Sequence, residues 1–240
     1  IRKMLIKTKA IVLSSLKYQE KGLIAKCYTQ QDGVKTYFIP NAFSSKKSNQ
    51  KIAYFQPLTV LEIEANHKNK GTLEHFKEIK IAYPYQTINN DIYKSTIVIF
   101  LSEVLTNCIQ EEEKNDDLFT FLETALIWLD TNDETQNFHL LLLIELTKFL
   151  GFYPDISTID LPFFNINEGS FTLFQGLQCM SEHQTFLFKK LLLLKFDGNQ
   201  KQFSGTERQI VLQQLLDYFA IHLSGFRKPK SLDVLKEVFA

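Results

Sequence analysis

Leu23-Ile-Ala-Lys-Cys-Tyr-Thr29 leads through Gln30-Gln-Asp-Gly33 into Val34-Lys-Thr-Tyr-Phe-Ile39, and this pattern sets the architecture of the first third of the chain. β-Branched and aromatic residues on both sides of an Asp-Gly pair predict two antiparallel strands joined by a hairpin turn. Side chains alternate between the two faces of a strand. We therefore expect Phe38 in the core and Tyr37 on the opposite, accessible face.

The same pattern extends in both directions from this hairpin. Thr8–Leu16, Leu58–Ala65 and a stretch within Leu73–Ala82 are also strand-like, and Pro40–Gln50 interrupts them as a basic loop. Five short strands in about 75 residues are typical of a small barrel, and the OB-fold is the natural candidate. Phe55 is expected in its core.

After Pro84 the period of the apolar residues changes to that of helices. Helices are expected at Asp91–Gln110, Asp116–Leu129 and Phe138–Phe149. Capping-box patterns at Ser181–Gln184 and Thr206–Gln209 predict two more, and a short one follows Lys230. The expected fold class is α+β: an OB-fold barrel over residues 1–82 and a helical domain over residues 83–240. The helical domain carries a short irregular or hairpin insertion near residues 155–176.

Charge is distributed unevenly although the net charge is zero. Residues 1–80 carry 15 Lys and Arg against 6 Asp and Glu, residues 81–150 carry 3 against 12, and residues 151–240 carry 9 against 9. Such a division predicts separate surfaces with different partners, the first of them a polyanion; the alternative is that these charges only solvate the surface. Without a membrane-length apolar run or a signal-peptide layout, the expected location is the cytoplasm.

Sequence motifs for catalysis or cofactors are missing. The 9 glycines form no phosphate-binding pattern, and the 5 histidines and 3 cysteines have no metal-ligand spacing. We expect neither an enzyme nor a cofactor. The acidic cluster Glu111–Asp117 leaves open a metal-dependent hydrolase or nuclease, although such clusters are more often solvated linkers.

Lysines and aromatic residues alternate along the expected barrel, a composition suited to single-stranded nucleic acid. Tyr37 is the stacking candidate. Near the other end of the chain, a turn interrupted by Gly225 and Pro229 brings together Arg227, Lys228 and Lys230.

Several short motifs resemble the bacterial RecO recombination-mediator family, in order along almost the whole chain. They are Ala10-Ile-Val-Leu13, Tyr18-x-Glu20-Lys-Gly-Leu-Ile24, Thr29-x-x-x-Gly33, Phe55-Gln-Pro-Leu58, Gly151-Phe-Tyr-Pro154, Glu168-Gly-Ser-Phe171, Tyr218-x-x-x-His222 and Lys230-Ser-Leu232. The resemblance implies an OB-fold followed by helices. It also implies binding of single- and double-stranded DNA and annealing of complementary strands in gap and double-strand-break repair. The implied partners are RecR, in loading RecA, and the C-terminal tail of single-stranded DNA-binding protein.

By position, the family's DNA-binding residues fall on two sets here. The barrel set is Lys9, Lys35, Lys46, Lys47 and Lys51, and the C-terminal set is Arg227, Lys228 and Lys230. Two features depart from the family pattern. The four-cysteine zinc site of many members has no counterpart at Asp155–Gly176, so no structural zinc is expected. The family's Gly-Ala-Arg-Lys loop is replaced by Asn41–Lys47.

The sequence thus predicts a non-enzymatic DNA-repair mediator, a monomer when alone, whose DNA runs from the barrel to the basic turn. The acidic helices between Asp91 and Glu145 are expected to face a basic protein such as RecR. A groove with a cation should take the acidic tail, and Lys148, Lys189, Lys190 and Arg208 are equal candidates for that cation. The alternative is a helical interaction scaffold whose barrel binds protein instead of DNA.

Overall fold

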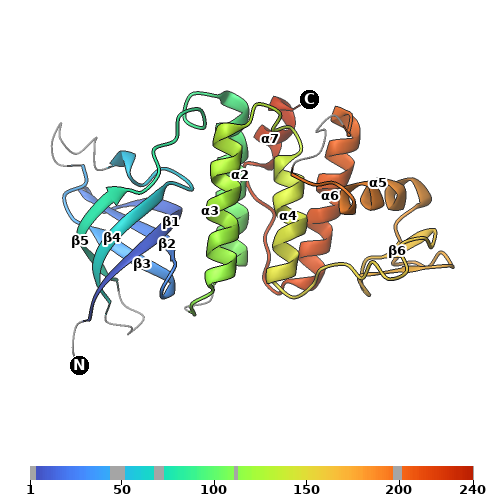
Figure 1. Cartoon of the computed structure of the whole chain (residues 1–240), viewed down its shortest axis with the longest axis horizontal. Coiled ribbons are helices and arrows are strands. Elements are labelled where there is room, and N and C mark those ends of the chain that lie inside the picture. The colour runs from blue at the N-terminus through green and yellow to red at the C-terminus, as the bar shows by residue number, and fades with distance from the viewer. Residues whose placement is uncertain (1–3, 44–51, 68–72, 111–112, 197–201, 240) are drawn as a thin grey trace. The chain divides into compact units, whose positions relative to one another are not determined.

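The chain folds into two compact units, residues 1–131 and residues 132–240. The structure, a computed structural model, describes residues 4–43, 52–67, 73–110, 113–196 and 202–239 (Figure 1). Among its described residues, the first unit holds a five-stranded sheet and the helices α2 and α3. The second holds the helices α4 to α7 and a small hairpin.

The sheet of the first unit is antiparallel, with the order β3-β2-β1-β4-β5. Its strands are β1 (Met4–Tyr18), β2 (Gly22–Thr29), β3 (Gly33–Ile39), β4 (Val60–His67) and β5 (His75–Ile81). The two edge strands, β3 and β5, meet at Glu74, the residue before β5. The N–H of Phe38 donates to the carbonyl of Glu74 (2.9 Å), and the N–H of Glu74 donates to the carbonyl of Thr36 (2.8 Å). These parallel bonds join β3 to the start of β5, which gives an OB-like barrel and confirms the expected fold class.

The barrel core corrects the expected orientation of β3. Tyr37 is completely buried, whereas Phe38 is half-buried. Directly paired residues of antiparallel strands point to the same face, and Tyr37 pairs with Ala25, a core residue of β2. The strand is therefore one residue out of the assumed phase, which exchanges its two faces. Phe55 is buried, as expected.

Both faces of β1 are buried in the middle of the strand, at residues 10–13. Val12 lies inside the barrel, while the carbonyl of Leu13 accepts a hydrogen bond from Thr106 Oγ1 of α2 (3.1 Å). Tyr28 of β2 packs on Phe119 of α3, with ring centroids 5.9 Å apart. The helices α2 (Ile92–Cys108) and α3 (Asp116–Thr131) thus cover one side of the barrel, and the first unit extends to residue 131. The predicted domain boundary between residues 82 and 83 lies in the connection between β5, which ends at Ile81, and α2, which begins at Ile92. This boundary stays a prediction.

Asp130, near the end of α3, holds the segment that connects β5 to α2. Its buried carboxylate accepts hydrogen bonds from the backbone N–H groups of Gln86, Thr87 and Ile88 at 2.9–3.1 Å. The ammonium of Lys94, itself buried, donates to the Asp130 carbonyl (3.2 Å) and to Thr87 Oγ1 (2.8 Å). Burial raises the pKa of Asp130, but the hydrogen bonds outweigh it and hold that pKa below its usual value.

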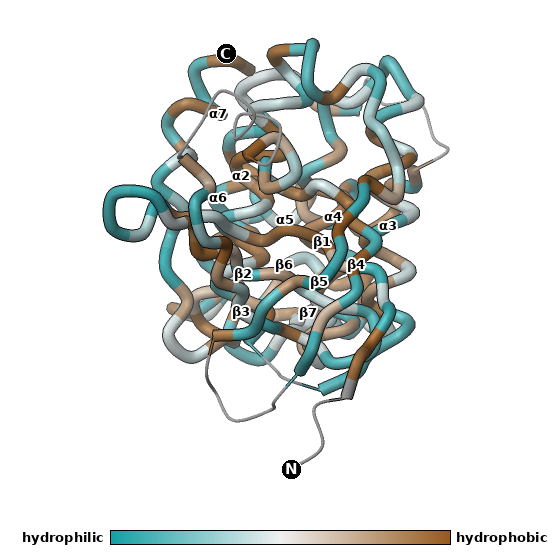
Figure 2. The backbone as a smooth tube through the Cα atoms, turned by 90° about the vertical axis from the view of Figure 1, so that its left-hand side faces the viewer, coloured by the Kyte–Doolittle hydropathy of each residue, from teal (hydrophilic) through white to brown (hydrophobic). Residues whose placement is uncertain are grey.

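The second unit is built around α4 (Phe138–Phe149), whose residues 138–144 are all buried. Figure 2 shows this helix as a mostly hydrophobic segment. Such a sequence is expected because residues 138–144 leave no face of this part of α4 to water. Around it lie β6 (Phe163–Asn165), β7 (Ser170–Thr172), α5 (Glu182–Leu192), α6 (Gly205–His222) and α7 (Leu232–Val238).

The two long surface helices of this unit begin at capping boxes. Ser181 and Gln184 form the expected one at α5. The second one is misplaced in the sequence prediction, since α6 begins two residues earlier, with Ser204 as the N-cap and Glu207 as its partner. Ser204-Gly-Thr-Glu207 also satisfies the Ser-x-x-Glu pattern, and its glutamate stabilises the first turn through the helix dipole.

Tyr218 and His222 connect α6 to two loops of the second unit. The Tyr218 hydroxyl donates to the carbonyl of Phe152 (2.8 Å), and His222 Nε2 bonds to the carbonyl of Ile166 (2.8 Å). The His222 ring stacks on Phe152, with centroids 5.5 Å apart. Burial raises the pKa of Tyr218 to about 12, so its hydroxyl remains a donor. In this structure the Tyr-x-x-x-His motif has a packing role.

Gly169, in the β6–β7 turn, offers a test of this packing. Its φ is +65°, and a Cβ there would lie 2.6 Å from the Tyr218 hydroxyl. Gly169→Ala should therefore lower the free energy of unfolding by about 2 kcal/mol or more, through strain plus displacement of Tyr218. Gly151→Ala is the matched control, since φ is +81° there and nothing lies within 4 Å of the added carbon. Equal losses in urea unfolding would contradict the role of Tyr218.

Candidate nucleic-acid interface

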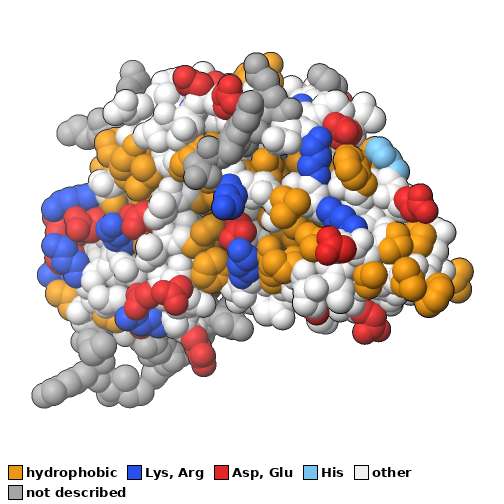
Figure 3. All heavy atoms as spheres, turned by 45° about the vertical axis from the view of Figure 1, so that its right-hand side comes forward, with side chains coloured by type: hydrophobic (Ala, Val, Ile, Leu, Met, Phe, Trp, Pro, Cys, Tyr) orange, Lys and Arg blue, Asp and Glu red, His pale blue; other side chains and the backbone are white. Residues whose placement is uncertain are grey.

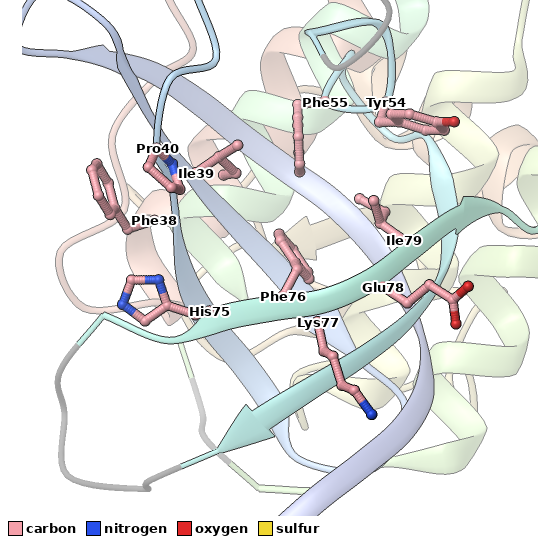
Figure 4. A pocket seen from close by; sticks show the side chains of 10 residues that line it. All are labelled: Phe38, Ile39, Pro40, Tyr54, Phe55, His75, Phe76, Lys77, Glu78 and Ile79. Atoms are coloured by element: carbon pink, nitrogen blue, oxygen red, sulfur yellow. The ribbon is translucent and has the colours of Figure 1, made fainter. Parts of the chain in front are cut away.

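A pocket of about 440 Å³ opens at one end of the barrel. Figure 4 shows its walls: β3 and the following Pro40 on one side, residues 54–55 on another, and β5 across the floor. Four aromatic or imidazole rings that are at least partly exposed line it: Phe38, Tyr54, His75 and Phe76. Phe55, Ile39 and Ile79 make the inner wall apolar.

Next to the pocket lies a chain of three polar side chains, of which Tyr37 and His67 are buried and Asp32 is partly exposed. The Tyr37 hydroxyl bonds to His67 Nε2 (2.7 Å), and His67 Nδ1 bonds to Asp32 Oδ2 (2.5 Å). Because a carboxylate can only accept, a neutral His67 carries its proton on Nδ1 and accepts from Tyr37 at Nε2. Burial, followed by the nearby Cys27, Asp32 and Glu74, raises the pKa of Tyr37 far above its usual value, so the hydroxyl keeps its proton. Tyr37 is thereby fixed at both ring and hydroxyl.

The described barrel residues of the predicted DNA set are less accessible than expected. Tyr37 is 0% exposed and Lys35 only 7%, so neither side chain lies on the accessible face where it was expected, and their contact with DNA stays a prediction. Lys35 pairs with Cys27 of the core face, and the phase shift of β3 that buries Tyr37 also turns Lys35 inward. Lys9 is paired with Glu123 of α3 at 2.7 Å. Lys46, Lys47 and Lys51 lie outside the described residues.

Sequence reasoning missed other residues of the barrel surface. Lys77 and Lys80 of β5 are exposed, with side chains 61% and 64% accessible. Phe38, His75 and Phe76 also reach the pocket. The residues of β5 are largely solvent-exposed along its length, as in an edge strand. The charged residues between Leu73 and Ala82 were the available signal, although charge alone does not reveal a pocket.

The predicted C-terminal basic set lies in the turn between α6 and α7. Arg227, Lys228 and Lys230 are all exposed, and Gly225 turns the chain there with a φ of +79°. Lys228 Nζ forms an ion pair with Asp217 of α6 (3.0 Å). Such an exposed pair contributes little stability, so Lys228 can exchange Asp217 for a phosphate at small cost.

The four candidate cations for an acidic tail have different surroundings in the second unit. Lys148 pairs with Glu145 (2.8 Å), and Lys189 donates to the carbonyl of Leu161 (2.7 Å). Lys190 lies over the Phe203 ring, 4.9 Å from its centroid, and Arg208 donates to the carbonyl of Phe203 (3.0 Å). These contacts do not join the four cations into a single cluster.

Apolar side chains are exposed beside the hairpin of the second unit. Figure 3 shows them gathered over this part of the surface. Leu173, Phe174 and Leu177 follow β7 and are 56%, 77% and 102% exposed, and Phe186 of α5 is 60% exposed.

Within the described ranges, no three His, Cys, Asp or Glu side chains are grouped so as to hold a metal ion. Asp116, of the acidic cluster, pairs with Lys114 at 2.6 Å. No described helix is both long and apolar enough to span a bilayer. Burial raises the pKa of the Cys108 thiol to about 12, and that of Cys27 further still.

An OB-like barrel followed by a helical region, with a ring-lined pocket and an exposed basic turn, defines the class of protein: an α+β protein with a small N-terminal barrel. Two family models match consecutive parts of the chain. "Recombination protein O N terminal" covers residues 4–85, and "Recombination protein O C terminal" covers residues 89–232.

Named relatives match over the full length. "DNA repair protein RecO" of Flavobacterium johnsoniae is 66% identical over 237 residues, 99% of this chain and 100% of the relative. The protein of the same name from Flavobacterium psychrophilum is 64% identical, and that from Bacteroides fragilis 36%, with 99% and 98% of this chain covered and 100% of each relative. The chain belongs to the RecO family, and this membership supports a role in DNA repair and recombination.

Proposed function

We propose that this protein is a non-enzymatic recombination mediator of gap and double-strand-break repair. It binds single- and double-stranded DNA, anneals complementary strands and, with RecR, helps to load RecA onto DNA coated by single-stranded DNA-binding protein. The observation that carries the proposal is the match of both halves of the chain to the RecO family. Its place of action is the cytoplasm, at the nucleoid, and it needs no cofactor.

Charge supports the DNA-binding part of the proposal. Residues 1–80 carry an excess of nine positive charges, and Arg227, Lys228 and Lys230 are exposed. Contacts of lysine and arginine with phosphates release counterions, so affinity falls steeply with salt. Neutralising two backbones at once also favours their annealing without any reading of bases.

Partner binding falls to the rest of the chain in this proposal. The acidic residues 81–150, with 12 Asp and Glu against 3 Lys, suit a basic surface of RecR. The tail of single-stranded DNA-binding protein is acidic with an apolar end, and the second unit offers exposed apolar side chains near Phe186 together with Lys189 and Lys190 on the same helix.

The test is fluorescence anisotropy of labelled single-stranded DNA over a salt series. The protein should bind at micromolar concentration or tighter, with the affinity falling as a power of salt. Two triple alanine variants, of Lys46, Lys47 and Lys51 and of Arg227, Lys228 and Lys230, should each bind more weakly with a shallower slope, by about 0.7 for each lost phosphate contact. Lys195→Ala, at an exposed position of the second unit, is the control.

Two results would argue against the proposal. If the protein does not bind DNA at low salt, the barrel belongs to an interaction scaffold. If DNA is cleaved in the presence of Mg²⁺ and the cleavage disappears in the Asp116→Ala/Asp117→Ala variant, the protein is a nuclease.

A further inference from the structure

The barrel pocket has the form of a site for a flat ring. Its volume of about 440 Å³ lies in the range of small-ligand sites, and its walls are apolar with a few polar groups at the edge. Rings from three separate segments reach it, namely Phe38, Tyr54, and His75 with Phe76. Figure 4 shows Phe76 rising from β5 toward the centre of the pocket, opposite Phe55.

The ring of Phe76 is held in place by the buried ring of Tyr37. Its ring is stacked on Tyr37, with centroids 4.0 Å apart and planes 15° apart. Tyr37 is fully buried and held through His67 and Asp32, so this side of Phe76 is closed and fixed. Phe76 also contacts Phe55, with ring centroids 5.8 Å apart, but it is only half-buried and lines the pocket, so part of its ring stays available to a ligand there. A ring that is already in position loses little entropy when a ligand stacks on it.

The polar groups of the pocket do not make a phosphate site. Its lining contains one lysine, Lys77, and one glutamate, Glu78, whose charges offset each other. Tyr54 and His75 add groups that can donate or accept hydrogen bonds. A ligand with uncharged apolar faces and polar edges matches this arrangement, and a nucleobase has that chemistry.

We infer that the pocket takes one unstacked base of single-stranded DNA, with the base against Phe76, and with His75 on one side of it and Tyr54 on the other (Figure 4). The inference rests on the proposed function, because it requires single-stranded DNA as the ligand. An apolar side chain of a protein is the competing occupant, but it would make no hydrogen bonds with the polar groups at the edge. A base would contact both the apolar walls of the pocket and the polar groups at its edge.

The experiment compares two labelled strands with the same number of phosphates, oligothymidine and an abasic strand of equal length. The wild-type protein should bind oligothymidine about tenfold more tightly, since stacking on an aromatic side chain is the main gain from a base. Phe76→Leu keeps an apolar side chain but removes the ring. It should reduce this ratio at least threefold and leave the salt slope unchanged, because no phosphate contact is lost.

His75→Ala is the second variant. Because His75 is exposed, this substitution should leave the fold intact even if Phe76→Leu does not fold. It should lower the same ratio by about twofold to threefold. Phe174→Leu is the matched control: this ring is 77% exposed but lies in the second unit, and its loss should leave the ratio as in the wild type.

The outcomes separate this inference from the proposed function. If both folded pocket variants keep the wild-type ratio and the DNA affinity remains salt-dependent, the pocket inference is wrong and the proposed function stands. If the wild-type protein binds neither strand, both are wrong. If the pocket variants retain DNA binding but no longer bind a protein partner, the pocket is a protein site and the inference is overturned.

Discussion

Replacing Asp130 with alanine should lower the free energy of unfolding of the first unit by about 3 kcal/mol. The side chain accepts hydrogen bonds from three consecutive backbone N–H groups, those of Gln86, Thr87 and Ile88. Alanine leaves these donors without their acceptor in a buried turn, and it leaves the buried Lys94 without the neighbouring negative charge. Urea unfolding followed by fluorescence measures the loss, because Trp128, the only tryptophan, lies on the same helix.

Two further variants define the cause of that loss. Asp133→Ala changes an exposed carboxylate three residues away and should alter the stability by no more than about 0.5 kcal/mol. Asp130→Asn retains one acceptor oxygen and should fall between the wild type and Asp130→Ala. If Asp130→Ala were as stable as Asp133→Ala, the clamp on the β5–α2 connection would have no energetic importance.

Acidification should destabilise the second unit through His139. Burial, and then the charge of Arg208, lowers the pKa of His139 from 6.5 to about 3 in the folded protein. Between these two values the unfolded chain binds one more proton than the folded chain, so stability falls as the pH falls. The loss is about 1.4 kcal/mol for each pH unit, or roughly 3 kcal/mol at pH 4, and there is none above about pH 7.

The measurement is urea unfolding by circular dichroism at several pH values, with hydrogen exchange of the α4 peptides as a local probe. His139→Gln cannot take up this proton, so its deficit relative to the wild type should shrink by roughly 3 kcal/mol between pH 7 and pH 4. Ile144→Val, a packing change on the same helix, should give a deficit of about 1 kcal/mol that is independent of pH. A pH-independent deficit for His139→Gln would show that this proton does not matter.

The sequence was sufficient for the order and type of the elements. Each expected strand of the barrel is present, because β-branched runs between turn residues leave few other structures open. The helix Phe138–Phe149 has the predicted bounds, since Gly151 ends it. The start of α6 could not be chosen on pattern alone, because Ser204 and Thr206 both begin capping-box motifs.

The candidate site was harder to predict, for two reasons. Alternation along β3 shows that Tyr37 and Phe38 face opposite ways, but only pairing with Ala25 shows which of them faces the core. Tyrosine on the inside also needs a partner for its hydroxyl, and His67 lies 30 residues further along the chain. The pocket combines β3, residues 54–55 and β5, which become neighbours only when the barrel forms.

The two hydrogen bonds between Glu74 and β3 have a further consequence. Among the described residues, adjacent strands elsewhere in the barrel are paired over six or more residues, whereas this seam is joined by these two hydrogen bonds. Phe38 and Ile39 stand on one side of the seam, and His75 to Ile79 stand on the other. The spacing of β3 and β5 at the seam therefore sets the width of the pocket, and we expect this seam to separate more readily than the longer pairings.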